Sequence, residues 1–264
     1  MNIVITGGSG FVGSYLCEKL INDGHEIIVV DNLLTGSTEN INHLMHNENF
    51  SFIEHDVQNH IEIENKVDYV LHFASAASPK AYTEHPVNTL KAGSVGTINT
   101  LGLAKKHDAE FLLASTSEVY GDPLISPQTE EYWGNVNPNG ERSMYDEAKR
   151  FAEAAVATYS RSYDLKTKIV RIFNTYGPRM QLNDGRVVTN FIVQALKNEN
   201  ITIYGDGSQT RSFSYVEDTV AGIISLMNSS EYDVFNIGNP NEMTVGQLAE
   251  KIIELTDSTS EIKY

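Results

Sequence analysis

Two short segments of this chain carry the side chains that chemistry on a secondary alcohol needs. The first, residues 115–121, reads Ser-Thr-Ser-Glu-Val-Tyr-Gly and offers hydroxyls and a carboxylate on Thr116, Ser117 and Glu118. In the second, Tyr145 and Lys149 are four residues apart and so share one face of a predicted helix. A phenol normally ionises at about pH 10, and a neighbouring ammonium favours the phenolate. Tyr145 is therefore a candidate base, and Thr116 can hydrogen-bond the same alcohol oxygen.

A glycine-rich opening indicates that a dinucleotide lies beside these groups. Gly7, Gly10 and Gly13 follow a short apolar strand and open a helix, the context in which such a pattern cradles a pyrophosphate. Asp31 ends the next strand, where a carboxylate binds ribose hydroxyls and repels a 2′-phosphate. The pattern predicts NAD rather than NADP, and the alternative is a glycine turn without a ligand. The predicted cofactor residues are Gly7, Gly10, Phe11, Val12, Gly13, Asp31, Asn32, Asp56, Val57, Tyr145 and Lys149.

Several other charged residues each have two interpretations. Asp56 either flanks the adenine or is a plain loop acid, and Glu118 is either a second acid–base group or an ordinary loop carboxylate. The guanidinium of Arg211 could hold a carboxylate or a phosphate, or form a surface ion pair. Arg179 and Arg186 fall in predicted loops, where either could serve a diphosphate. None of the eight histidines has the spacing of metal ligands, so no metal site is predicted.

Strands and helices alternate along the first part of the chain, which is typical of a doubly wound parallel sheet. We expect strands at residues 2–6, 26–31, 50–53, 67–73, 110–115 and 168–173, and helices at 11–23, 87–107 and 143–163. After Asn174, glycine-containing loops alternate with a helix near 187–197, a short strand at 201–204 and a capped helix from Thr244 to Leu255. The prediction is an α/β fold with a Rossmann-like domain at 1–174 and a smaller C-terminal substrate-binding lobe at 175–264. This boundary is approximate, because the chain is expected to interleave between the two lobes.

The amino-acid composition indicates which kinds of binding partner and which cellular compartment to expect for this protein. The 264 residues include 19 basic and 35 acidic side chains, a net charge of −16, and no basic block. A nucleic-acid partner is therefore not expected. The single cysteine, Cys17, excludes a disulfide framework and favours a reducing compartment. No apolar run approaches the roughly 20 residues of a membrane span, and no leader precedes the first strand. We expect a cytoplasmic protein without a membrane partner.

Longer stretches make the chain similar to a known enzyme family. They are residues 115–122, 128–138 (Gln-Thr-Glu-Glu-Tyr-Trp-Gly-Asn-Val-Asn-Pro), 171–179 (Arg-Ile-Phe-Asn-Thr-Tyr-Gly-Pro-Arg), 183–188 (Asn-Asp-Gly-Arg-Val-Val) and 204–213, with Ala-Ser-Pro at 77–79 and Tyr82. Together with the motifs above, they resemble the UDP-glucuronate decarboxylases (UDP-xylose synthases), within the extended short-chain dehydrogenases/reductases. The resemblance runs from Asn2 to about Met243.

This resemblance implies an NAD-dependent enzyme that oxidises C4 of UDP-glucuronate, releases carbon dioxide and reduces C4 again, giving UDP-xylose. The catalytic residues that it implies are Thr116, Ser117, Glu118, Tyr145, Lys149 and Arg211. The residues that it implies at the UDP-sugar are Ser78, Pro79, Tyr82, Asn174, Arg179, Arg186, Val188, Tyr204, Gln209, Arg211 and Tyr215. It also implies a homodimer packed through the helices near 87–107 and 143–163.

The residue at position 117 distinguishes decarboxylation from the reactions of related enzymes. Related nucleotide-sugar 4,6-dehydratases carry Asp where this chain has Ser117, and that acid helps to expel the C6 hydroxyl. A C6 carboxylate needs no such acid, so Ser117 favours decarboxylation. Three features depart from the family: Ser37-Thr38 replaces a basic pair, Lys80 stands where an apolar residue is usual, and the chain stops at Tyr264 before an arginine-containing segment. The alternatives are another nucleotide-sugar 4-epimerase or 4,6-dehydratase, or a truncated, non-catalytic NAD-binding protein.

Overall fold

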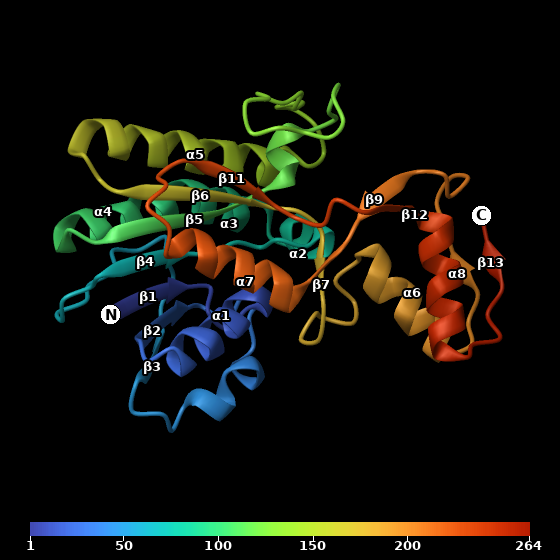
Figure 1. Cartoon of the computed structure of the whole chain (residues 1–264), viewed down its shortest axis with the longest axis horizontal. Helices are drawn as coiled ribbons and strands as arrows, with labels where there is room; N and C mark the ends of the chain where they lie inside the picture. The colour runs from blue at the N-terminus through green and yellow to red at the C-terminus, as the bar shows by residue number, and fades with distance from the viewer.

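A parallel sheet of seven strands forms the centre of the computed structural model, which describes all residues 1–264 (Figure 1). In spatial order the strands are β11 (Val234–Ile237), β6 (Thr167–Ile172), β5 (Glu110–Thr116), β4 (Tyr69–His72), β1 (Asn2–Thr6), β2 (Glu26–Asp31) and β3 (Phe50–Glu54). Every neighbouring pair is parallel, so all strands end at the same edge. The chain order reverses between β1 and β4, and doubly wound sheets bind their ligands at such a reversal.

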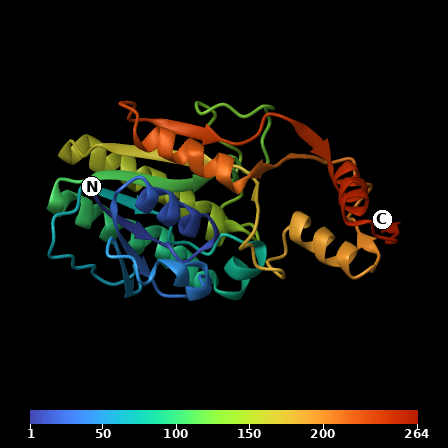
Figure 2. The same ribbon diagram turned by 60° about the horizontal axis from the view of Figure 1, so that its bottom comes forward.

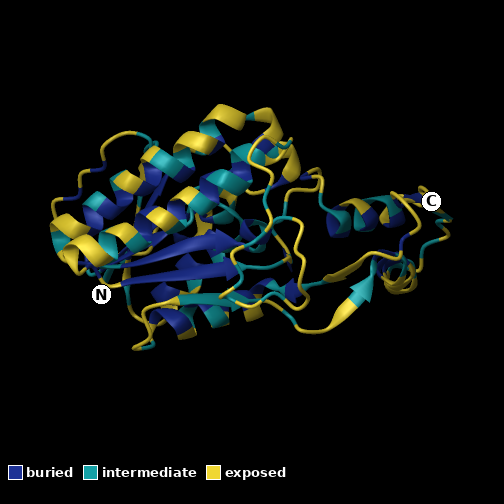
Figure 3. Cartoon of the chain, turned by 90° about the horizontal axis from the view of Figure 1, so that it is seen from above, coloured by how far each residue is buried: buried dark blue, intermediate teal, exposed yellow.

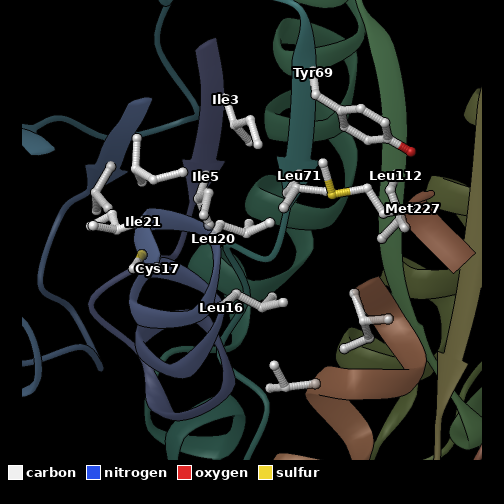
Figure 4. Close-up of a cluster of buried hydrophobic side chains, with 14 of the residues drawn as sticks. Ile3, Ile5, Leu16, Cys17, Leu20, Ile21, Tyr69, Leu71, Leu112 and Met227 are labelled. Carbon is white, nitrogen blue, oxygen red and sulfur yellow. The ribbon is translucent and has the colours of Figure 1, made fainter. Parts of the chain in front are cut away.

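Helices cover both faces of the sheet (Figure 2). On one face, α1 (Phe11–Asn22) and α7 (Val216–Met227) share a core with Leu71 and Leu112 of the strands (Figure 4). On the other face lie α3 (Pro86–Lys91), α4 (Thr97–His107) and α5 (Ser143–Tyr163). The central strands are the most completely buried part of the chain (Figure 3). No helix combines the length and the apolar character that crossing a membrane requires.

The helix predicted at residues 87–107 is interrupted. α3 and α4 are joined by the π-helical turn η3 (Ala92–Gly96), where the helical stretch approaches α5. A Cβ atom on Gly93 would lie 2.7 Å from the Cβ of Ala148, so only glycine allows this approach. The remaining short helices are η1 (Thr38–Asn40), η2 (Asn42–Leu44), α2 (Pro79–Glu84) and η4 (Ser117–Tyr120).

A smaller lobe is built around α6 (Val187–Leu196) and α8 (Val245–Thr256), which lie side by side in Figure 1. Apolar side chains from both helices, including Phe191 and Leu248, form its core. The predicted capping box opens α8, because the Thr244 hydroxyl accepts from Gln247 N at 3.0 Å and Gln247 Oε1 accepts from Thr244 N at 2.9 Å. Short strands pair within the lobe and at its junction: β8 (Ile201–Thr202) with β13 (Ile262–Lys263), β9 (Thr210–Ser212) with β12 (Glu242–Thr244), and β7 (Thr175–Tyr176) with β10 (Ser214–Tyr215).

The two lobes interleave in sequence. α7 and β11 return to the large sheet, where β11 pairs with β6 from Val234 beside Ile169 onward. The buried ammonium of Lys168 holds the end of α7 against the sheet, because it donates to the carbonyls of Met227 at 2.7 Å and Ser229 at 2.8 Å. β11 gives a weak sequence signal, because it has only four residues and is half-buried. The small lobe therefore consists of two stretches, about residues 177–213 and 239–264.

Candidate active site

A cavity of about 730 Å³ opens at the carboxyl ends of the strands, between the sheet and the small lobe. Residues at or just after the ends of β1, β2, β4, β5 and β6 line it, and α6 and β9 contribute from the small lobe. Most of the predicted site residues meet there: Gly7, Gly10, Phe11, Val12, Gly13, Asp31, Asn32, Asp56, Val57, Ser78, Pro79, Tyr82, Thr116, Ser117, Glu118, Tyr145, Lys149, Asn174, Arg179, Arg186, Val188 and Arg211.

Three residues expected at the UDP-sugar lie outside this cavity. The side chain of Tyr204 is 90% exposed, and Gln209 Nε2 is occupied by the Tyr204 carbonyl at 2.9 Å. Tyr215 packs edge-on against Tyr176, with ring centres 5.6 Å apart, at the junction of the lobes. The turns around β8 to β10 direct these side chains away from the cavity, which sequence spacing alone does not reveal.

The glycine-rich turn between β1 and α1 is shaped to admit a phosphate. Gly7 has a φ of +74°, and a Cβ on it would lie 2.7 Å from Ala74 N. A Cβ on Gly13 would lie 2.3 Å from the Gly7 carbonyl oxygen, so only glycine lets α1 begin this close to the turn. Gly10 precedes α1 and provides no side-chain cap, which leaves the first N–H groups of the helix available to an anion. These residues fit a dinucleotide pyrophosphate.

Asp31 lies buried at the end of β2, facing the same part of the cavity. Its carboxylate accepts hydrogen bonds from the backbone N–H groups of Ser9 at 3.0 Å and Leu33 at 2.9 Å. Burial raises the pKa of this carboxyl, and the two backbone hydrogen bonds oppose the rise. Beside it, the Asn32 amide donates to Asp56 Oδ2 at 3.0 Å and fixes the loop after β3. An acceptor-only group with lone pairs to spare suits ribose hydroxyls and disfavours a 2′-phosphate.

Tyr145 and Lys149 lie buried on the side of α5 that faces the cavity. Burial raises the pKa of the Tyr145 phenol to about 12, and hydrogen bonding with Thr116 opposes the rise. Burial lowers the pKa of the Lys149 ammonium to about 8, and the charge of Glu153 opposes that fall. The ammonium donates to the Ala114 carbonyl at 2.8 Å and lies 6.0 Å from the centre of the Tyr145 ring. Its charge is therefore close enough to favour the phenolate.

The predicted hydroxyls and carboxylate sit on the adjoining wall. Thr116 ends β5, and its hydroxyl accepts from Glu118 N at 3.3 Å, which starts the tight turn η4. Tyr82 of α2 stacks on the Tyr145 ring at 5.1 Å and holds it against this wall. Lys80, one of the departures from the family pattern, does not line the cavity and lies 4.0 Å from Glu84.

Two charged residues beside Glu118 did not stand out in the sequence. Arg142 lines the cavity, forms an ion pair with Glu118, and lies 3.8 Å from Asp146 Oδ1. Burial raises the pKa of Asp146 to about 6, with Arg142 opposing the shift and Glu118 adding to it. The available signal was position, because Arg142 precedes Tyr145 by three residues and so lies near it where α5 begins.

The three predicted arginines occupy different parts of the cavity. Arg186 is close enough for its charge to lower the pKa of Tyr145, and its Nε lies 3.1 Å from Asp184 Oδ2 in a geometry that leaves that buried N–H without a hydrogen bond. Arg211 is exposed on β9 and donates to its neighbour's carbonyl. Arg179, expected at the UDP-sugar, instead forms an ion pair with Glu18 of α1, on the cofactor side. Of the three, Arg186 faces the phenol.

Comparison with known proteins agrees with this geometry. The chain is 53% identical over 262 residues to UDP-glucuronic acid decarboxylase 1 of Xenopus tropicalis, covering 99% of this chain and 62% of that protein. It is 52% identical to UDP-glucuronic acid decarboxylase 3 of Arabidopsis thaliana, covering 100% of this chain and 77% of that protein. The chain thus spans less than two thirds of the first relative's length.

Solved structures show the same architecture. The UDP-glucose 4-epimerase of Thermotoga maritima, solved with UDP-glucose, superimposes with a TM-score of 0.90 at 32% identity, covering 100% of this chain and 85% of that one. The dTDP-glucose 4,6-dehydratase of Bacillus anthracis, solved in complex with NAD, gives 0.87 at 28% identity, covering 100% and 84%. The model of the NAD dependent epimerase/dehydratase family matches residues 3–238. The chain belongs to the NAD dependent epimerase/dehydratase family.

Proposed function

We propose that this protein is an NAD-dependent carboxy-lyase that converts UDP-glucuronate to UDP-xylose. The observation that carries the proposal is one cavity in which the Tyr145/Lys149 pair faces Thr116, Ser117 and Glu118 beside a glycine cradle. The relatives named UDP-glucuronic acid decarboxylases support the choice of substrate.

The proposed roles follow from where each group lies. When bound, NAD would accept the hydride from sugar C4, give it back to C4 after carbon dioxide has left, and supply a positively charged ring. Tyr145 takes the proton of the C4 hydroxyl, with the Lys149 charge favouring its phenolate. The resulting 4-ketone is β to the C6 carboxylate, so carbon dioxide can leave as negative charge develops on the ketone oxygen. Tyr145 and Thr116 would stabilise that oxygen by hydrogen bonds, and Glu118 would return a proton to C5 through water.

Other cavity residues are proposed to hold the UDP-sugar. Arg186 is placed to meet an anionic group near the phenol, because its Nε–H is buried without a hydrogen bond. Asn174, Val188 and Arg211 line the side of the cavity toward the small lobe, and Ser78 and Pro79 line the wall at the start of α2. Since Ser117 stands beside Glu118 at the position where the 4,6-dehydratases carry an acid, this position argues against the 4,6-dehydratase.

A second candidate is a 4-epimerase acting on another UDP-sugar. It is favoured by the likeness to the Thermotoga maritima epimerase and needs the same Tyr145/Lys149 pair. The test is incubation of the chain with NAD and UDP-glucuronate, followed by mass spectrometry of the nucleotide sugar. Loss of carbon dioxide with formation of UDP-xylose supports the proposal. An unchanged mass, with UDP-glucose isomerised to UDP-galactose in a parallel reaction, supports the epimerase.

The Tyr145→Phe variant provides the matched control for either reaction. It should lose turnover while it keeps NAD, because the phenol oxygen is proposed to act on the sugar and is not part of the glycine cradle. Wild-type turnover in this variant would remove Tyr145 from the mechanism. Absence of both reactions in the wild type, with NAD bound, would favour the third alternative of a non-catalytic NAD-binding protein.

We also propose a homodimer and a cytoplasmic location. Exposed apolar side chains gather along α3, η3, α4 and α5 (Val87, Leu90, Val95, Ile98 and Phe151), and a second copy could cover them. Light scattering at micromolar concentration tests the dimer, and a monomer mass would refute it.

The cytoplasmic proposal rests on the reduced, buried Cys17.

A further inference from the structure

A strap, residues 177–186, connects β7 to α6 and lies between the large sheet and the small lobe (Figure 1). Residues 179–182 and 184–186 of this strap line the cavity. Two of its side chains reach the large lobe: Arg179 contacts α1, and Gln181 Nε2 donates to the Thr35 carbonyl at 2.9 Å. One anchor lies on the helix that follows the glycine cradle and the other on the loop that follows Asp31. The strap therefore covers the part of the cavity that fits the dinucleotide.

The Arg179 anchor is the stronger of the two. Its guanidinium forms an ion pair with Glu18, donates to Ser14 Oγ at 3.1 Å, and lies 4.3 Å from the centre of the Tyr15 ring. Only 24% of the Arg179 side chain and 26% of the Glu18 side chain is exposed, so water screens this pair less than a surface pair. Arg179 has a φ of +70°, an unfavourable conformation for a residue with a side chain. Its contacts with α1 offset that unfavourable backbone.

The strap backbone itself is held weakly. Its internal hydrogen bonds are long, 3.4 Å from Met180 N to Gly177 O and 3.2 Å from Asp184 N to Gln181 O. Its one backbone hydrogen bond with the large lobe is also long, because the Pro178 carbonyl accepts from the Tyr15 hydroxyl at 3.5 Å. Segments with few backbone bonds open locally at low cost in free energy. Lifting the strap thus requires little more than the loss of its two side-chain anchors and of the long hydrogen bond from Tyr15.

We propose that the Arg179–Glu18 pair is a latch that holds the strap closed over bound NAD and sets the rate at which the cofactor leaves. A reaction that oxidises and then reduces the same sugar carbon regenerates NAD in every cycle, so a slow release of NAD is compatible with turnover. The inference requires that the chain binds NAD, but it does not depend on which sugar is the substrate.

Exchange of labelled NAD, measured without any sugar, tests the latch. The chain is loaded with radiolabelled NAD and chased with excess unlabelled NAD, and the label retained is followed in time. We expect Glu18→Gln to release NAD about tenfold faster, the equivalent of about 1.4 kcal/mol. Gln181→Ala, which removes the other anchor, should release NAD faster by a smaller factor. Hydrogen exchange at the amides of residues 180–185 should quicken in both variants.

His43→Gln is the matched control. His43 contacts Glu18 from within the large lobe, so this variant removes a partner of Glu18 and leaves the strap anchored. It should release NAD at the wild-type rate. Unchanged release from Glu18→Gln, or equal acceleration by His43→Gln, would overturn the latch, as would immediate loss of NAD from the wild type. If Glu18→Gln fails to fold, Arg179→Gln, which breaks the same ion pair from the strap side, decides the question. Failure of decarboxylation affects none of these results.

Discussion

Replacing Lys149 with methionine should make the stability difference between variant and wild type depend on pH. Burial lowers the pKa of this ammonium to about 8, whereas an unfolded chain holds the proton to about pH 10.4. Between these values the unfolded state binds one more proton than the folded state. The free energy of unfolding of the wild type therefore rises with pH in this window, by about 1.4 kcal/mol per unit. Below pH 8 both states keep the proton, and this contribution stays constant.

The expected size follows directly. From about pH 8 to about pH 9.5, the wild type should gain about 2 kcal/mol of unfolding free energy relative to Lys149→Met. Urea unfolding of both proteins without cofactor, followed by circular dichroism, measures the difference, and titration of the other groups cancels. Lys91→Met, at an exposed lysine of α3, is the control and should show no such trend. A difference that stays flat from pH 7 to about 9.5 would refute the desolvation of Lys149.

Three further outcomes are expected. Gly13→Ala, whose Cβ would lie 2.3 Å from a backbone oxygen, should abolish NAD binding and destabilise the fold by about 1–3 kcal/mol; tight NAD binding in a calorimetric titration would contradict this. Arg171→Met should cost about 3 kcal/mol, because it leaves the partly buried Glu153 carboxylate without its ion-pair partner and with only the Ser115 hydroxyl as a donor; urea unfolding should show the loss and a partial recovery in the double variant with Glu153→Met. Arg142→Met should lower kcat with little change in NAD affinity, because it frees Glu118, and Arg142→Lys should restore part of the rate; equal kinetics in both variants would show that Arg142 does not position Glu118.

The sequence predicts the parallel sheet and the reactive residues at its carboxyl edge, because both can be recognised from patterns within short stretches of the chain. Apolar runs mark the buried strands, and the spacing of Tyr145 and Lys149 places them on one face of a helix whatever surrounds it. The glycine cradle is readable for a similar reason, since its steric demands arise within a few residues.

What the sequence does not predict depends on contacts between distant segments. β11 becomes a strand only because the edge of β6 is open to it, and Arg142 joins the site only because η4 brings Glu118 next to α5. Arg179 illustrates the same limit, because its motif places it in a loop but not on the cofactor side. Only the resemblance predicts Tyr204 and Gln209 at the sugar. In the structure, the turns after β8 direct both side chains to solvent.

The sheet of the nascent chain stays incomplete until β11 is synthesised, because β11 is the last of its strands in the sequence. β6 emerges long before β11, with a whole stretch of the small lobe between them. Until residues 234–237 are made, β6 is an open sheet edge with unpaired backbone groups. Lys168 also lacks the two carbonyls that hold its ammonium until Met227 and Ser229 have been made. While this edge is open, the large lobe of the nascent chain is prone to aggregate through its unpaired strand. Protection by a chaperone therefore matters most during this interval.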